Sequence, residues 1–179
     1  MTVRRVVTGV GPDGKSTVVS EAAVSPLTAQ ALPGYAWHRI WSLDSIGPVP
    51  GDGAEQPAPD HFPPPHGIRF NLFTVPPAGT KPAVGLDPRA AQQQLDELFP
   101  GRSKHMEQDQ AGLHTTASID FVYIASGEIW LELDGTNEIH LRAGDAVVQN
   151  GVRHAWRNHS DRPCTMVICL VGAPRRTVT

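Results

Sequence analysis

The sequence has two cysteines, Cys164 and Cys169, and it has no long apolar run. If TMVICLV around them is a strand, five residues at about 3.3 Å each place their Cα atoms about 16 Å apart, beyond the reach of a disulfide. We therefore expect two free, buried thiols, which is typical of a reducing compartment such as the cytoplasm. No window approaches the ~18 consecutive apolar residues of a membrane span.

The sequence also lacks a large excess of charge of one sign, because its formal net charge is −3. Such a chain has no basic surface to hold nucleic acid or an anionic membrane, so charge-driven binding to either is excluded. The opening MTVRRVVTGV contains two arginines, but its apolar stretch is too short for a signal peptide. We expect the mature protein to begin here, in the cytosol.

Glycine and proline are abundant, with 17 of each in 179 residues. Together they make about a fifth of the chain, against a usual share of roughly 12%, which indicates turns and short strands. Charged residues make up only 18%, which excludes a disordered polyelectrolyte, and the length suits one domain.

Residues 1–66 have a weak pattern, in which TVVS (residues 17–20) and HRIWSL (residues 38–43) are candidate strands, and we interpret this region as an N-terminal arm. A proline-rich stretch occupies residues 48–65, and we expect it to lie as an extended segment over the core or over a neighbouring subunit. His61 and His66 lie in this region without a recognised ligand spacing, so we interpret both as exposed loop histidines.

The pattern of apolar and polar residues becomes more regular after Gly67. IRFNLFTV over residues 68–75 alternates in polarity and predicts a strand. Asp87 and Pro88 supply an N-cap and a first-turn proline, and apolar residues then recur at helical spacing. The sequence therefore predicts one short helix at about residues 88–99.

From residue 114 the chain is almost entirely short strand-like runs with turns between them. EIWLELD and EIHLRA, joined by a turn at Asp134 and Gly135, predict a hairpin with one buried side. Many short strands at regular spacing are typical of a sandwich or barrel, of which a jelly roll is one closed form. The predicted fold class is all-β.

Three side chains in this region suggest chemistry: His114, Asp120 and His154. Even offsets along a strand place His114 and Asp120 on one face, and hairpin topology can bring His154 to them. A buried carboxylate costs several kcal/mol unless it is compensated, and a divalent cation bound with two neutral imidazoles would compensate it. Two histidines and one carboxylate form the facial triad of non-haem iron sites, and they also suit zinc, manganese or nickel.

An ordinary structural role is the alternative for the same residues. Arg153 and Arg157 flank His154, so Asp120 can instead be an ion-pair partner and the histidines can be satisfied core groups. The residues alone leave both interpretations open.

The segment GLHTTASIDFVYIASGEIWLELDGTNEIHLRAGDAVVQNGVRHAWRN resembles the cupin superfamily. Counting back from Gly127 places Asp120 at the glutamate of the first cupin motif, His114 at its first histidine and Thr116 at its second. His154 occupies the histidine position of the second motif. The shared runs HTT, GEI and HAWRN are similar to those of a group of small bacterial cupins.

The resemblance implies a cupin double-stranded β-helix, a jelly-roll barrel, over about residues 67–175. It also implies one divalent metal ion held by His114, Asp120 and His154, with Fe, Mn, Ni or Zn as candidates. Thr116 replaces a family histidine, and Asp120 is one methylene shorter than the family glutamate. Cupins are often dimers, so a homodimer is expected.

Residue parity extends this site to a substrate pocket. Trp156 and Asn158 share the side of His154, and Gln149 is a polar residue on an otherwise mostly apolar strand. With Thr116, these are the predicted pocket residues. We interpret His140 as a surface histidine and Trp130 as part of a second packing surface. His105 and Glu107 lie just ahead of the motif and belong to a solvated loop or to the rim.

The first functional hypothesis is a metal-dependent enzyme acting on a small carbonyl, enol, organic acid or phenolic compound, with the metal as Lewis acid or O₂-binding centre. Oxygenase, isomerase, decarboxylase and cyclase chemistry all occur in the superfamily, and the fold does not choose among them. No motif residue is an obvious general acid or base, so the catalytic residues are unknown. The alternative is a non-catalytic barrel that binds a small molecule without a functional metal. A purely structural subunit is the third possibility.

Overall fold

The computed structural model describes residues 2–81, 84–107, 110–134 and 138–176. The N-terminal half contains β1 (Val3–Val10), β2 (Ser16–Val24), β3 (Leu27–Ala29), β4 (Leu32–Leu43), β5 (Ile68–Val75), α1 (Pro88–Leu98) and the 3₁₀ turn η1 (Arg102–His105). The C-terminal half contains β6 (Ser118–Ser126), β7 (Glu128–Glu132), β8 (Glu138–Arg142), β9 (Ala146–Asn150), β10 (Ala155–Arg157) and β11 (Cys164–Gly172).

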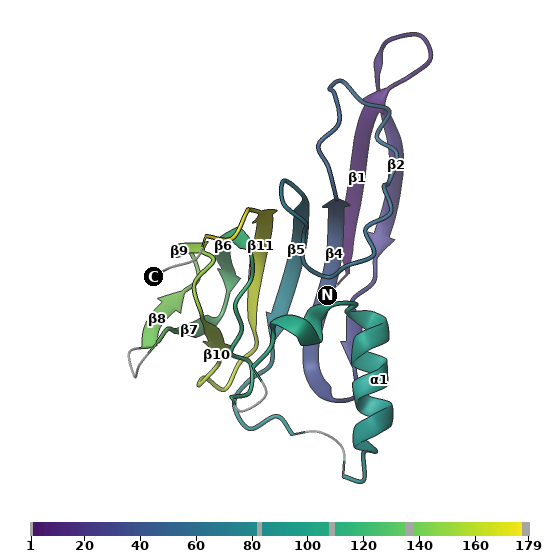
Figure 1. Cartoon of the computed structure of the whole chain (residues 1–179). Coiled ribbons are helices and arrows are strands. Elements are labelled where there is room, and N and C mark those ends of the chain that lie inside the picture. Colours follow the sequence, from purple (N-terminus) through teal and green to yellow (C-terminus); the bar gives the residue numbers. More distant parts are fainter. Residues whose placement is uncertain (1, 82–83, 108–109, 135–137, 177–179) are drawn as a thin grey trace.

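Strands dominate, as the sequence predicts. Within the described ranges, the strands form antiparallel sheets in the orders β1-β2, β10-β7-β8 and β3-β4-β5-β11-β6-β9. Figure 1 shows the β1-β2 hairpin projecting beyond the end of the largest sheet, with α1 beside β4 at the opposite end. The all-β class with one α-helix is confirmed.

The core lies between the three-stranded and six-stranded sheets. Residues of β11 alternate between buried and half-buried along the whole strand, as expected when one face of a sheet is covered. Ile124 from β6, Ile129 from β7 and Met166 from β11 are all fully buried in this core. The predicted hairpin is confirmed as β7 and β8, and Gly135 of its predicted turn lies outside the described residues.

The predicted helix is confirmed as α1. The side chain of Asp87 caps it by accepting a hydrogen bond from the Arg89 backbone N–H at 3.0 Å, and Pro88 occupies the first turn. Ala91 and Phe99 are buried against the sheet.

The N-terminal arm contains more regular structure than its weak pattern indicates. Strand β4 is paired with β5 from Ala36 to Leu43, so this part of the arm continues the six-stranded sheet. The division of the chain at residue 66 stays a prediction.

The proline-rich segment between β4 and β5 lies on the core of its own chain. It first runs beside the hairpin, where the Val10 N–H donates to the Gly51 carbonyl at 3.1 Å. It then returns to β11, where the His66 N–H donates to the Gly172 carbonyl at 2.8 Å. His66 is exposed, as predicted.

Cys164 and Cys169 are both free, which confirms the prediction of two unpaired thiols. Burial raises the pKa of Cys164 to about 11, so its thiol is protonated at neutral pH. Neither helix in the described ranges is long and apolar enough to cross a lipid bilayer.

Candidate functional site

A cavity of about 240 Å³ opens on the inner face of the six-stranded sheet. Its wall is largely aromatic, with contributions from Tyr35, Trp37, Phe62, Phe73, Phe99 and Trp156. The rings of Trp37 and Phe73 are the closest pair, with centroids 4.3 Å apart. This wall suits a ligand with an apolar or aromatic body.

Two of the predicted metal ligands, His114 and His154, meet at this cavity. Their backbones are joined in both directions, because each N–H donates to the carbonyl of the other at 3.0 Å. Their imidazole centroids lie 4.3 Å apart. The structure therefore brings together two histidines that are forty residues apart in the sequence.

Each imidazole is fixed through the same nitrogen. Nδ1 of His114 lies 2.9 Å from the Gly112 carbonyl, and Nδ1 of His154 lies 2.9 Å from the Val152 carbonyl. A carbonyl only accepts, so both Nδ1 atoms carry the proton and both Nε2 atoms keep a free lone pair. Metal-bound histidines are commonly oriented by the same type of contact.

Both imidazoles are neutral at pH 7. Burial, together with a smaller contribution from the neighbouring His154, lowers the pKa of His114 to about 4. Burial also lowers the pKa of His154. Neutral imidazole is the form that binds a metal ion, so the pair does not have to lose a proton first.

Asp120, the third predicted ligand, lines the same cavity and is buried. Its carboxylate accepts a hydrogen bond of 2.5 Å from the Ser118 hydroxyl. Burial raises the pKa of Asp120 to about 6, and the Ser118 hydrogen bond opposes that shift. In the described part of the chain, no three His, Cys, Asp or Glu side chains lie close enough together to hold a metal ion.

The four predicted pocket residues have different surroundings. Trp156 lines the cavity, and its ring meets that of His154 edge to face at 5.9 Å. Gln149 is buried opposite Asp120 across the β6-β9 pair, and its Nε2 makes no hydrogen bond to the described residues. Thr116 is buried beside the Ser118 hydroxyl at 2.9 Å and borders a smaller neighbouring cavity.

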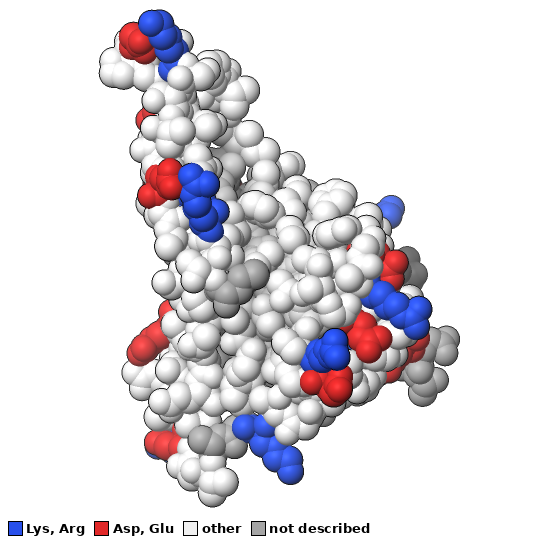
Figure 2. Space-filling model, turned by 180° about the vertical axis from the view of Figure 1, so that it is seen from behind, with Lys and Arg blue, Asp and Glu red and all other residues white. Residues whose placement is uncertain are grey.

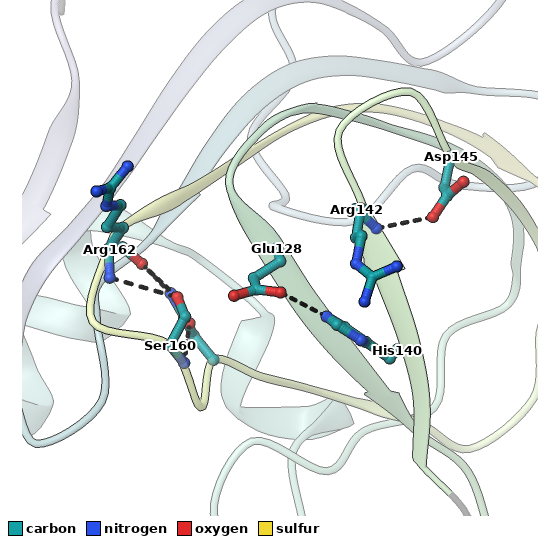
Figure 3. A network of polar contacts seen from close by, with 7 residues as sticks. Glu128, His140, Arg142, Asp145, Ser160 and Arg162 are labelled. Carbon is teal, nitrogen blue, oxygen red and sulfur yellow. Dashed lines mark hydrogen bonds and ion pairs between the residues drawn. The ribbon is translucent and has the colours of Figure 1, made fainter.

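Asn158 lies in the turn after β10, outside the lining of the main cavity. Its Oδ1 accepts from the Ser160 N–H at 2.9 Å, and its Nδ2 donates to the Arg162 carbonyl at 2.8 Å. Figure 3 shows Ser160 and Arg162 of this turn beside the Glu128 and His140 pair. The side chain of Asn158 thus organises the turn that leads into β11.

His61 is the clearest departure from the sequence-based expectation. We predicted an exposed loop histidine, but His61 is buried and lines the cavity, so that prediction is wrong. Its ring packs 4.8 Å from Trp37 and 5.2 Å from Phe99. The adjacent Phe62 was the available signal, because a large apolar residue in a proline-rich segment favours docking on the core.

Two residues of η1 and the segment after it support the site from outside. The ring of His105 packs on Phe62 at 4.7 Å, and its Nδ1 lies 3.2 Å from the Thr115 carbonyl. Glu107 pairs with Arg153, whose Nε lies 2.5 Å from the carboxylate. The Glu107 carboxylate thereby ties the segment before His114 to the residue before His154.

The surface prediction for His140 is confirmed. It is exposed, and its Nε2 lies 2.6 Å from Glu128, as Figure 3 shows. It also stacks on Trp130 with a centroid distance of 4.1 Å. The predicted packing surface at Trp130 is therefore covered by a side chain of the same sheet.

Residues 104–171 match the family model of the cupin domain. The match contains His114, Asp120 and His154, and it confirms the resemblance drawn from their spacing. The cavity residues Trp37, His61 and Phe99 lie outside it.

Curated relatives come from fungi. The phomopsin biosynthesis cluster protein C' of Diaporthe leptostromiformis is 36% identical over 81 residues, which is 45% of this chain and 39% of that protein. The oryzines biosynthesis cluster protein J of Aspergillus oryzae is 40% identical over 47 residues, 26% of each chain. The chain thus spans less than half of the relatives it matches. The expected membership of a bacterial group stays a prediction.

Solved structures with a similar fold include the polyketide cyclase RemF from Streptomyces resistomycificus. It has a TM-score of 0.46 at 15% identity, over 87% of this chain and 80% of that one. A cupin from Methanocaldococcus jannaschii with a double-stranded β-helix has a TM-score of 0.40 at 13% identity, over 68% and 84% of the two chains.

Proposed function

We propose that this protein is an enzyme that acts on a small, largely apolar organic molecule bearing an oxygen function, with a divalent metal ion at His114 and His154. One observation carries the proposal: two neutral imidazoles, both fixed through Nδ1, meet at an aromatic cavity.

The donor atoms of this pair suit a metal ion. Both Nε2 lone pairs are free, and Asp120 borders the same cavity as a candidate third ligand. A bound Fe, Mn, Ni or Zn ion would supply Lewis-acid polarisation of a substrate carbonyl or enol oxygen, or an O₂-reactive centre in the case of Fe(II).

The protein's own residues would bind and orient the substrate. The rings of Trp37, Phe73 and Trp156 would hold its apolar body and exclude water from the reacting end. Asp120, with its pKa raised to about 6, would hold or release a proton at its carboxyl oxygen near neutral pH. The curated relatives are named for biosynthesis clusters, which supports a biosynthetic small molecule as the substrate.

A metal-free barrel that binds a small molecule is the second candidate. It is favoured by the lack of a three-ligand group in the described ranges, since two imidazoles alone are a weak site. For either function we retain the cytoplasm as the proposed compartment, supported by the two free thiols.

Metal analysis separates these two candidates. Wild type, His114→Ala and His154→Ala are purified without a metal-chelating tag, reconstituted with Fe(II), Mn(II), Ni(II) or Zn(II), and analysed by elemental mass spectrometry. We expect near-stoichiometric metal in wild type and at least a tenfold loss in both variants. His140→Ala is the matched control, because His140 is an exposed histidine paired with a carboxylate, and it should retain metal.

Wild type that binds none of the four metals would contradict the metal enzyme and leave the binding barrel. Asp120→Ala adds a second comparison. An enzyme should lose turnover in this variant, whereas a binding barrel should keep its ligand affinity.

A further inference from the structure

Arg102 is a cation without a partner in the cavity wall. Its side chain lines the cavity, yet it makes no hydrogen bond and no ion pair with any described residue. Arg157 also lines the cavity, but its Nε donates to Glu132 at 2.6 Å and its Nη1 to the Ala111 carbonyl. Of the two arginines in the lining, Arg102 is therefore the one whose guanidinium has no hydrogen-bonded or ion-paired partner among the described residues.

The backbone holds Arg102 in place from two sides. Its N–H donates to the Phe99 carbonyl at 3.1 Å, directly after α1 ends. The Pro100 carbonyl accepts from the His61 N–H at 2.8 Å, which ties this turn to the proline-rich segment. Gly101 between them has φ +76°, and a Cβ there would lie 3.1 Å from Asp60 Oδ1. The start of η1 is thus fixed by local geometry.

Nearby charges do not neutralise the guanidinium. Burial lowers the pKa of Arg102, and Tyr35 and Asp96 only partly oppose that shift. The Asp96 carboxylate accepts from Gln92 Nε2 at 3.1 Å and makes no ion pair with Arg102. Arg102 is half-buried, so its charge is partly removed from water, and a bound anion would compensate for that loss of hydration.

We propose that Arg102 binds the carboxylate of an aromatic or otherwise apolar organic acid whose body lies in the cavity and extends toward His114 and His154. A planar guanidinium matches a carboxylate through two parallel hydrogen bonds. The aromatic lining supplies the surface for the apolar body. The proposal rests on the proposed function for the location of the ligand, but it does not require a bound metal.

Two probes of equal shape test this proposal. Naphthalene-2-carboxylate and the neutral 2-naphthamide are titrated by calorimetry into wild-type protein at pH 7.5 with a chelator present. We expect the carboxylate to bind at least tenfold more tightly than the amide. In Arg102→Gln the two probes should bind equally, with the amide affinity unchanged, and Arg102→Lys should restore part of the preference.

Arg162→Gln is the matched control, because this arginine is exposed and is not part of the cavity lining, and it should retain the preference. The proposal is overturned if wild type binds the carboxylate no better than the amide, or if the preference survives in Arg102→Gln. The chelator keeps metal out of these titrations, so failure of the metal proposal and failure of the Arg102 proposal give different results.

The outer face of the six-stranded sheet carries a row of residues across five strands, Val148, Phe121, Cys169, Phe70 and Trp41. Phe121 and Val148 are exposed by 50% and 55%. The Arg5 guanidinium of β1 lies over Trp41, 5.2 Å from its ring centroid. Figure 2 shows a broad uncharged area between the hairpin and a charged edge. Nothing in the structure shows what covers the rest of this row, so it carries no second inference.

Discussion

His61 illustrates how a single residue depends on contacts far away in the sequence. Its neighbours in the chain include prolines and Asp60, which are typical of a loop, and only the adjacent Phe62 indicates that the segment docks on the core. Its burial depends on Trp37 from β4 and Phe99 after α1, and sequence spacing does not reveal these contacts. In contrast, parity along one strand was enough to place Asp120 and Gln149 inward.

The buried His61 predicts a pH dependence of stability. Burial lowers its pKa from 6.5 to about 3, so the unfolded chain binds a proton between these values and the folded chain does not. Stability from this group is therefore complete above pH 6.5 and is lost as the pH falls toward 3. From pH 7 to pH 5 this loss amounts to about 2 kcal/mol in the free energy of unfolding.

Urea unfolding at pH 7 and pH 5 measures this effect. We expect wild type and His66→Asn to lose stability between the two pH values, because His66 is exposed and lies in the same segment. His61→Asn should lose about 2 kcal/mol less over the same interval. Equal losses in all three proteins would contradict this role for His61.

At the scale of elements, local signals predicted some segments well. The helix has its cap, its first-turn proline and its apolar spacing within a dozen residues, so α1 was predictable. The β7-β8 hairpin was predictable for the same reason. Strand β4 was not fully predicted, because LPGYAWHRIWSL is half-buried along most of its length and lacks a clear alternation.

The junction of β6 and β7 depends on Gly127. This residue has φ +75°, and a Cβ there would lie 2.5 Å from the Pro163 carbonyl oxygen. Gly14, at the tip of the β1-β2 hairpin, also has φ +75° but has no atom within 4 Å of its Cβ position. The two glycines share the same backbone conformation and differ in the space around them.

We expect Gly127→Ala to destabilise the protein more than Gly14→Ala. Both variants should lose about 1 kcal/mol from the left-handed conformation. Gly127→Ala should lose about 1–3 kcal/mol more, because the backbone of residues 163 and 164 must move. Thermal or urea unfolding of the two variants measures the difference, and equal losses would show that the close approach does not constrain the junction.

At the scale of the whole molecule, the cavity combines parts of the chain that the sequence keeps apart. The motif spacing predicted the residues that meet at one end, His114 and His154, because the cupin resemblance encodes their topology. The other end, with Trp37, His61 and Arg102, depends on how the N-terminal strands and the proline-rich segment fold back. Motif spacing does not encode that arrangement, so the aromatic wall of the cavity was not predictable.

This division between the two ends has a consequence for divergence among relatives. Residues 104–171, which match the family model, contain both histidines and Asp120, whereas Arg102 and the aromatic wall around Trp37 precede them. Mutations before residue 104 can therefore change which molecule the cavity accepts while the imidazole pair stays intact. Related barrels can in this way keep the imidazole pair and differ in the molecule that their cavities bind. We expect a chimera that carries the N-terminal segment of another relative to bind the molecule that this relative prefers.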